Sequence, residues 1–204
     1  MVIGFIKHCG RGIALGVALG MGGLGVQAQA TPVATPATPW LSTFGKGTVE
    51  IRLYTDFFCN PCRAEESEVA ALLAQIVDRQ AARVTFVDYP GHQDSSLYAV
   101  YFLAALNAKG GGDIHLALAL RAAFYEAAAA QVSGQAALEQ YLSGKGIPHR
   151  PLDYRPTFKL FEKWILEDKV LETPRCTIIG ARDRESISGK SRILKALQGL
   201  AQGK

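Results

Sequence analysis

Two cysteines stand three residues apart in the stretch YTDFFCNPCRAEE, Tyr54–Glu66, where two different sequence patterns meet. Before them, apolar and polar residues alternate from Val49 to Leu53, and this period of two predicts a β-strand. After them, apolar residues recur at helical spacing, which predicts an amphipathic helix. We therefore expect Cys59 at the end of a strand and Cys62 one turn into a helix, with the two sulfur atoms close enough to bridge.

The first turn of a helix is a favourable place for thiol chemistry. Backbone N–H groups and the helix dipole favour negative charge there, and so favour the thiolate, which is the nucleophile in disulfide exchange. Pro61 fits an early helical position, because its missing N–H needs no partner there. From the residues alone, the pair could still be a redox couple, half of a metal site or a structural disulfide.

The first 30 residues predict a cleaved secretory signal peptide. Basic residues lie near the start, residues 13–26 form a glycine-rich apolar core, and Ala28–Ala30 is a small-x-small cleavage sequence. The core is shorter than the about 20 apolar residues of a spanning helix, although an uncleaved anchor is the alternative. Cleavage predicts a mature protein in the periplasm or another extracytoplasmic space, where disulfides persist.

Removal of this segment changes the charge and the cysteine count. The chain has 22 Lys and Arg residues against 18 Asp and Glu residues, a net charge of +4, and the segment carries Lys7 and Arg11 but no acid. The net charge falls to about +2, which is too small to indicate nucleic-acid binding. Cys9 also lies in the segment, so three of the 4 cysteines remain.

The rest of the chain predicts one linker and one domain. Residues 31–47 combine prolines with small residues and read as an extended linker, whose end Trp40 and Phe44 would dock on the domain. Residues 48–204 have the length of one domain. Its expected order is strand, helix, strand, an all-helical insertion over about 95–169, two short strands and a closing helix. This order predicts an α/β fold, a small mixed sheet flanked by helices, with a right-handed parallel crossover at its start.

The motif DFFCNPC, the strand VTFVDYP, the helical insertion and the later motif ETPRCTIIG together resemble the DsbA-like family of thioredoxin-fold thiol–disulfide oxidoreductases. The resemblance covers about residues 48–200. It implies a redox couple in which Cys59 is the nucleophile and Cys62 its buried partner, with no cofactor. It also implies that Pro174 is a cis-proline beside this couple and that the backbone of Thr173 pairs with the substrate.

Three positions depart from the pattern of that family. Strongly oxidising members have a histidine before the second cysteine, where this chain has Pro61 after Asn60, so the redox direction stays open. Many relatives carry a buried acid on the strand, at about the position of Leu53. Cys176 is additional, and we expect a buried apolar residue there. A third redox thiol, a metal ligand or an intermolecular disulfide are its alternatives.

Further candidate accessory residues flank the cysteine pair. Asp56 matches an aspartate common in the broader family, and we expect it to cap the helix or to be solvated rather than to transfer protons. Phe58 is expected in the core or at the border of the substrate surface, and His92 in a surface loop. A structural zinc site needs four ligands, and the chain has no second CxxC motif or paired histidines to supply them.

The predicted function is an exported thiol–disulfide oxidoreductase that acts on cysteine-containing exported proteins and is served by a membrane redox partner. The oxidase direction is favoured over a reductase or isomerase. The alternative from another class is a Cu(I) carrier that uses Cys59, Cys62 and Cys176, since three thiolates suit this soft ion. The sequence indicates no other metal site and no oligomeric state.

Overall fold

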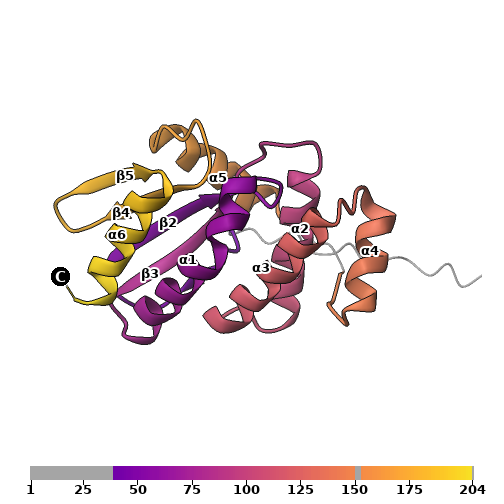
Figure 1. The fold of residues 1–204 in the computed structure, drawn as a ribbon, viewed down its shortest axis with the longest axis horizontal. Coiled ribbons are helices and arrows are strands. Elements are labelled where there is room, and N and C mark those ends of the chain that lie inside the picture. Colours follow the sequence, from indigo (N-terminus) through magenta and orange to yellow (C-terminus); the bar gives the residue numbers. More distant parts are fainter. Residues whose placement is uncertain (1–38, 150–152, 204) are drawn as a thin grey trace, which may run out of the picture. The chain divides into compact units, whose positions relative to one another are not determined.

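The computed structural model describes residues 39–149 and 153–203 (Figure 1). The expected signal peptide and the first part of the expected linker lie outside the described residues. In chain order the elements are β1 (Thr43–Phe44), β2 (Val49–Thr55), α1 (Asn60–Asp78), β3 (Ala82–Asp88), α2 (Ser95–Ala108), α3 (Ile114–Ala129), α4 (Gln135–Gly144), α5 (Arg155–Glu167), β4 (Arg175–Ile179), β5 (Arg184–Ser188) and α6 (Lys190–Ala201).

The strands form one mixed sheet in the order β1-β3-β2-β4-β5. β2 and β3 run parallel on either side of the α1 connection, with Ile51 opposite Val84 and Thr55 opposite Asp88. β4 pairs antiparallel with both β2 and β5, which leaves β5 at an edge. The predicted α/β class and the predicted parallel pair are therefore confirmed.

The folded domain begins before residue 48. β1 lies within the segment expected as a linker and pairs antiparallel with β3, where Thr43 stands opposite Thr85 with their hydroxyl oxygens 2.8 Å apart. The end of the segment docks as expected, because Phe44 is 1% exposed and Trp40 packs against the core. A strand of two residues is too short for a periodic signal, so only its pairing partner reveals it.

The two faces of the sheet are covered by different helices, because successive side chains of a strand point to opposite faces. Ile51 and Leu53 belong to the main core, which includes residues of α1 and α6. The residue after Leu53, Tyr54, belongs to a second cluster with Val87 of β3 and Phe161 of α5. Figure 1 shows α1 and α6 crossing in front of the strands.

The helical insertion divides into two parts. α2, α3 and α4 gather beyond one end of the sheet (Figure 1), and their core is aromatic: the ring of Phe57 lies 5.7 Å from that of Phe102 and 5.4 Å from that of Phe124. α5 instead covers the sheet through Phe161 and Trp164. The block predicted as one insertion therefore contains one helix that completes the layers around the sheet.

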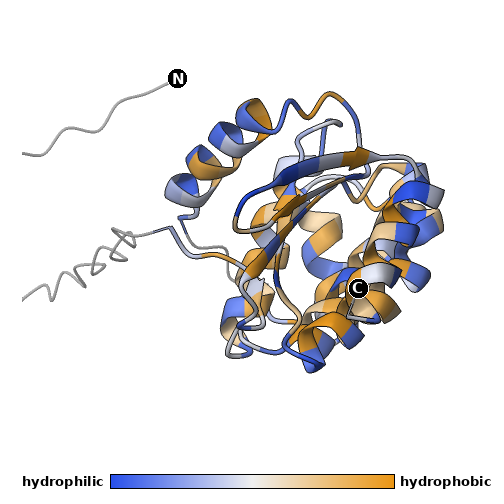
Figure 2. Cartoon of the chain, turned by 90° about the vertical axis from the view of Figure 1, so that its left-hand side faces the viewer, coloured by the Kyte–Doolittle hydropathy of each residue, from blue (hydrophilic) through white to orange (hydrophobic). Residues whose placement is uncertain are grey.

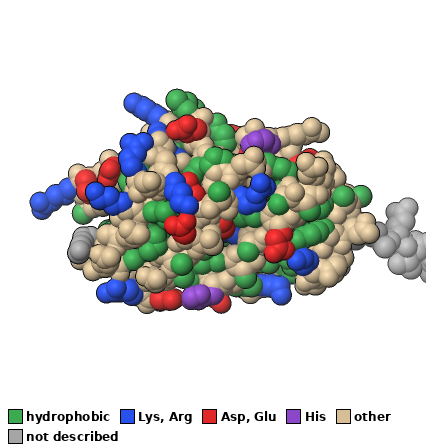
Figure 3. Space-filling model, in the orientation of Figure 1, with side chains coloured by type: hydrophobic (Ala, Val, Ile, Leu, Met, Phe, Trp, Pro, Cys, Tyr) green, Lys and Arg blue, Asp and Glu red, His purple; other side chains and the backbone are tan. Residues whose placement is uncertain are grey.

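The distribution of polar residues follows these layers. Figure 2 shows the more hydrophobic residues on the inner strands and on the helix sides turned toward them. On the face shown in Figure 3, Lys and Arg side chains are interspersed with Asp and Glu side chains. Among the described helices, none is both long and apolar enough to cross a membrane.

Candidate active site

Cys59 and Cys62 form a disulfide, and their Cα atoms are 5.3 Å apart. Cys59 is the N-cap residue of α1, and the backbone N–H of Cys62 donates to its sulfur at 3.2 Å. Pro61 lies in the first turn of the helix, where its missing backbone N–H would have no partner within the helix. Cys59 is 6% exposed and Cys62 3%. A negative charge on the sulfur of Cys59 would therefore face donors of the first helical turn.

Thr173 and Pro174 reach the cysteine pair from the loop before β4. The Thr173–Pro174 peptide bond is cis, and the carbonyl oxygen of Thr173 lies 3.3 Å from the sulfur of Cys59. Pro174 lines a small cavity together with Cys62. Thr173 and Cys59 are separated by 114 positions in the chain, so the fold alone brings them together.

Asn60 and Pro61 are exposed at the start of α1. The side-chain oxygen of Asn60 accepts a hydrogen bond from Arg63 at 2.7 Å. Phe58 is partly buried, packs edge-on against α2, and lines a hollow of about 450 Å³ together with Asn60, Arg63 and His92. Phe58 therefore lies at the border of the surface beside the dipeptide, which was one of the two placements expected for it.

Asp56 neither caps α1 nor is solvated, in contrast to the expectation. Its side chain is 1% exposed, and Oδ2 accepts hydrogen bonds from Ser95 Oγ at 2.8 Å and from the N–H of Gly91 at 3.1 Å. Nδ1 of His92, which is half exposed, lies 2.7 Å from the same oxygen. The other oxygen, Oδ1, accepts a hydrogen bond from the backbone N–H of Phe58 at 2.9 Å in the turn before α1, whose N-cap residue is Cys59. Through Oδ2, Asp56 ties the loop between β3 and α2 to the end of β2.

A buried acid that sequence reasoning missed lies on α1. Glu65 follows Cys62 by three residues, is 5% exposed, and its Oε2 has no hydrogen-bond partner among the described residues. With Cys62 and Pro174 it lines a cavity of about 10 Å³, which is the space of one water molecule. Burial raises the pKa of Glu65, against an opposing effect of Lys190. In the sequence, Glu65 looks like part of a solvated helix face.

Arg121 is fully buried and contacts both the strand and the helix that flank the cysteine pair. Nε and Nη2 of Arg121 on α3 donate to the two carboxylate oxygens of Glu66 on α1, at 2.7 and 2.9 Å. Nη1 and Nη2 each lie 3.3 Å from the hydroxyl of Thr55, the last residue of β2. This bidentate pair joins the insertion to the strand and helix that carry the cysteines. Arg121 lies in an alanine-rich stretch whose sequence gives no sign of this contact.

Cys176 is a free thiol in β4 and is fully buried, opposite Leu53 of β2. Burial, with a smaller effect of Glu185, raises the pKa of Cys176 to about 12. In the part of the chain that the structure describes, no three His, Cys, Asp or Glu side chains are placed to hold a metal ion. Cys176 therefore does not complete a three-thiolate site with the cysteine pair, as the Cu(I) alternative requires.

Comparison with known proteins agrees with this geometry. The sequence profile of the thioredoxin family matches residues 45–147, which is half of the chain. No curated protein matches the sequence. Among solved structures, the catalytic domain of Proteus mirabilis ScsC has a TM-score of 0.56 at 14% identity, over 79% of this chain and 89% of that one.

Two further solved structures give the same result. DsbA from Xylella fastidiosa has a TM-score of 0.59 at 18% identity, over 77% of this chain and 86% of that one. A periplasmic thioredoxin-like protein from Salmonella enterica serovar Typhimurium has a TM-score of 0.54 at 16% identity, over 79% of this chain and 90% of that one. At these identities the likeness shows the fold, while the matching profile shows the family. The chain therefore belongs to the thioredoxin family and has the DsbA-like fold of the thiol–disulfide oxidoreductases.

Proposed function

We propose that the protein is an exported thiol–disulfide oxidoreductase that exchanges disulfides with protein substrates through the Cys59–Cys62 couple. The observation that carries this proposal is the disulfide at the N-terminus of α1, with the sulfur of Cys59 beside the carbonyl of Thr173. Export to an extracytoplasmic space follows from the pattern of the first 30 residues.

In the oxidising direction, a substrate thiolate attacks the sulfur of Cys59. The Cys59–Cys62 bond breaks, Cys62 leaves as a thiolate, and a mixed disulfide joins the substrate to Cys59. A second substrate thiolate then attacks the substrate sulfur of that bond. The substrate leaves with a disulfide, Cys59 leaves as a thiolate facing the first turn of α1, and the protein retains two electrons. A disulfide-bearing membrane partner would remove these electrons by the same exchange.

Glu65 would handle the proton of the buried cysteine in this cycle. Cys62 is nearly inaccessible to solvent, and the one-water cavity beside it is also lined by Glu65. Because burial raises the pKa of Glu65, its carboxyl stays protonated to a higher pH than that of an exposed glutamate. It can therefore donate a proton to the Cys62 thiolate as this forms, and take a proton back in the reducing direction.

A reductase or isomerase is the second candidate, and the exposed Pro61 before the second cysteine is the observation that favours it. Equilibration of the full chain with reduced and oxidised glutathione tests the function and its direction together. We expect a reversible couple confined to Cys59 and Cys62. A potential near −120 mV supports the oxidase, and one near −270 mV supports the reductase or isomerase. A chain that exchanges with neither glutathione nor a dithiol peptide would contradict both.

An exposed leucine beside Thr173 offers a contact for the substrate chain. Leu171 is 86% exposed and stands two residues before Thr173. We expect Leu171→Asp to raise the KM for a reduced polypeptide by roughly tenfold, since burying a leucine is worth about 1.5–3 kcal/mol. The rate with dithiothreitol, which is too small to cover this side chain, should not change.

Leu166→Asp is the matched control for this prediction. Leu166 is 78% exposed but lies near the end of α5, five positions earlier in the chain than Leu171. We expect the Leu166→Asp variant to have an unchanged KM for the polypeptide. Equal losses in both variants would show that Leu171 makes no specific contact with the substrate.

A further inference from the structure

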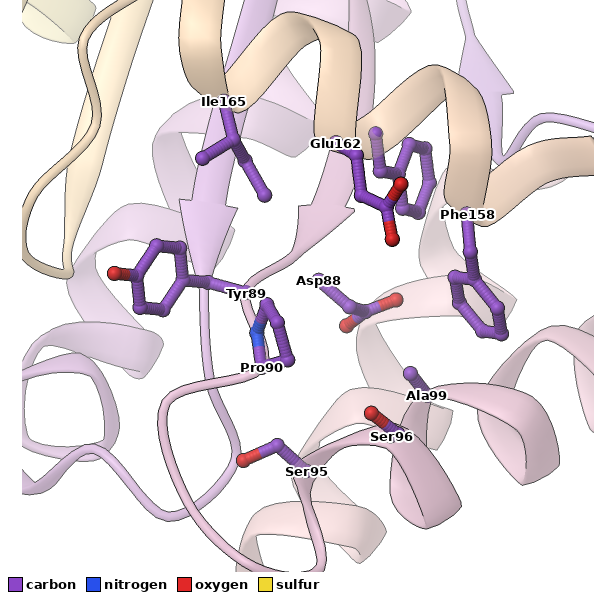
Figure 4. Close-up of a pocket in the computed structure, with 10 residues that line it drawn as sticks. Asp88, Tyr89, Pro90, Ser95, Ser96, Ala99, Phe158, Glu162 and Ile165 are labelled. Carbon is purple, nitrogen blue, oxygen red and sulfur yellow. The ribbon is translucent and has the colours of Figure 1, made fainter. Parts of the chain in front are cut away.

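A further cavity, apart from the two beside the cysteine pair, lies between the end of β3, the start of α2 and α5 (Figure 4). Its volume is about 190 Å³. Apolar side chains form most of its walls, and these are Pro90, Ala99, Phe158, Phe161 and Ile165. Two acids, Asp88 at the end of β3 and Glu162 on α5, also line it. The cavity thus combines apolar walls with two carboxyl groups.

The carboxyl of Asp88 is buried without a partner. Asp88 is 8% exposed, and neither of its carboxyl oxygens has a hydrogen-bond partner among the described residues. Nearly all buried polar groups in native proteins have such a partner. Figure 4 shows the carboxyl groups of Asp88 and Glu162 turned toward one another across the cavity. The carboxyl group of Asp88 therefore lacks a donor, and the described residues do not supply one.

The surrounding charges do not satisfy Asp88 either. Arg121 approaches from α3, but its donors are directed to Glu66 and Thr55. Asp56, beyond the end of β2, adds a like charge. Burial raises the pKa of Asp88 to about 7, Arg121 opposes this shift, and Asp56 adds to it. Near neutral pH, a positively charged occupant would therefore stabilise the ionised form of Asp88.

We propose that this cavity binds the side chain of a lysine in a polypeptide partner, with its alkyl part against Phe158 and Phe161 and its ammonium group between Asp88 and Glu162. The volume is below the roughly 300–1,000 Å³ of cofactor and drug-sized sites, and suits a single side chain. A lysine side chain joins a long apolar stem to a charged end. The stem matches the apolar walls of the cavity, and the charged end matches its two carboxyl groups. Its ammonium group has three donors for the two carboxylates.

Entry of the lysine requires side chains at the mouth of the cavity to turn. The oxygens of Asp88 are shielded from solvent, whereas Phe158 and Glu162 on α5 keep part of their surface exposed. Tyr89 and Ser96 also line the cavity, and they flank the loop that Asp56 ties to the end of β2. The choice of a polypeptide as the source of the ammonium group rests on the proposed function, but the affinity for an alkylammonium does not.

A peptide titration of the full chain tests this proposal. The probes are acetyl-Ala-Lys-Ala-amide and the same peptide with norleucine, which keeps the alkyl chain but lacks the ammonium group. Binding is followed through the backbone amide resonances of Ser96, Ala99 and Phe158. We expect saturable shifts with the lysine peptide and about tenfold weaker binding of the norleucine peptide, as for the loss of a charge-assisted hydrogen bond.

Substitutions assign the effect to the cavity. Asp88→Asn should weaken the binding of the lysine peptide about tenfold and leave the affinity for the norleucine peptide unchanged. Glu162→Gln, at an exposed position that tolerates the change, should weaken the lysine peptide by a smaller factor. Glu172→Gln, an exposed acid that does not line the cavity, is the matched control and should bind like the unaltered chain.

Three results would overturn the proposal: equal affinity for the two peptides, unchanged lysine binding in both Asp88→Asn and Glu162→Gln, or shifts confined to residues outside the cavity. A fourth arm uses n-butylamine. If it binds as tightly as the lysine peptide, the site recognises a free amine and the polypeptide part of the proposal fails. Because no thiol takes part in the titration, its failure would be separate from any failure of disulfide exchange.

Discussion

Replacing Cys59 by serine is expected to reduce disulfide exchange to the rate of the uncatalysed thiol reaction. A serine hydroxyl cannot form the mixed disulfide, and we expect that Cys62, the more buried of the pair at 3% against 6% exposed, does not replace Cys59. The measurement is the turnover of a reduced dithiol peptide by the full chain, with oxidised glutathione as the acceptor of the electrons. Cys176→Ala is the matched control and should keep full turnover, because Cys176 is fully buried and burial raises the pKa of its thiol to about 12.

The same peptide in its oxidised, disulfide form separates the roles of the two paired cysteines. In Cys62→Ser the Cys59 thiolate attacks the peptide disulfide and releases one peptide thiol, and no Cys62 thiol is present to resolve the bond that forms. A mixed disulfide between Cys59 and the peptide should therefore accumulate and be visible by mass spectrometry. Retained turnover in Cys59→Ser, or trapping of the peptide on Cys62, would overturn the assignment. Loss of turnover in Cys176→Ala with the fold intact would restore a role for the third thiol.

The central elements were predictable because their signals are local. β2 alternates in polarity, α1 has a buried stripe at helical spacing, and the predicted insertion begins at about residue 95, where α2 begins. The cysteine spacing at the boundary between β2 and α1 then placed both sulfur atoms. β1 was not predictable, since two residues carry no period and only pairing with β3 makes them a strand.

Much of the site depends on contacts that no local pattern reports. Asp56 was expected at a helix cap or in solvent, and its partners Gly91 and Ser95 come from the loop after β3 and from the first residue of α2. No motif marks Glu65 as buried, because the residues that enclose its cavity include Leu53 of β2, Pro174 before β4 and Ile193 of α6. For such residues the sequence supplies the chemical group, whereas burial and partner are properties of the fold.

Replacing Arg121 by methionine is expected to lower the free energy of unfolding by about 3–5 kcal/mol, the usual cost of removing one partner of a buried ion pair. Methionine fills a similar volume but leaves the carboxylate of Glu66, which is 13% exposed, without its bidentate donor. Thr55 loses its contact in the same change. Equilibrium unfolding in urea measures the effect, and a lower midpoint at an unchanged slope would indicate lost stability in an unaltered fold.

Lys145→Met is the control for that prediction, because Lys145 and Glu126 form an ion pair of the same length, 2.7 Å, with side chains 47% and 61% exposed. Such a surface pair contributes about 0–1 kcal/mol. Adding Glu66→Gln to Arg121→Met should recover part of the lost stability, because the double variant no longer buries an unpaired charge. Equal losses in Arg121→Met and Lys145→Met would instead mean that Arg121 only fills space, and that packing alone holds α3 against the helix that carries the cysteines.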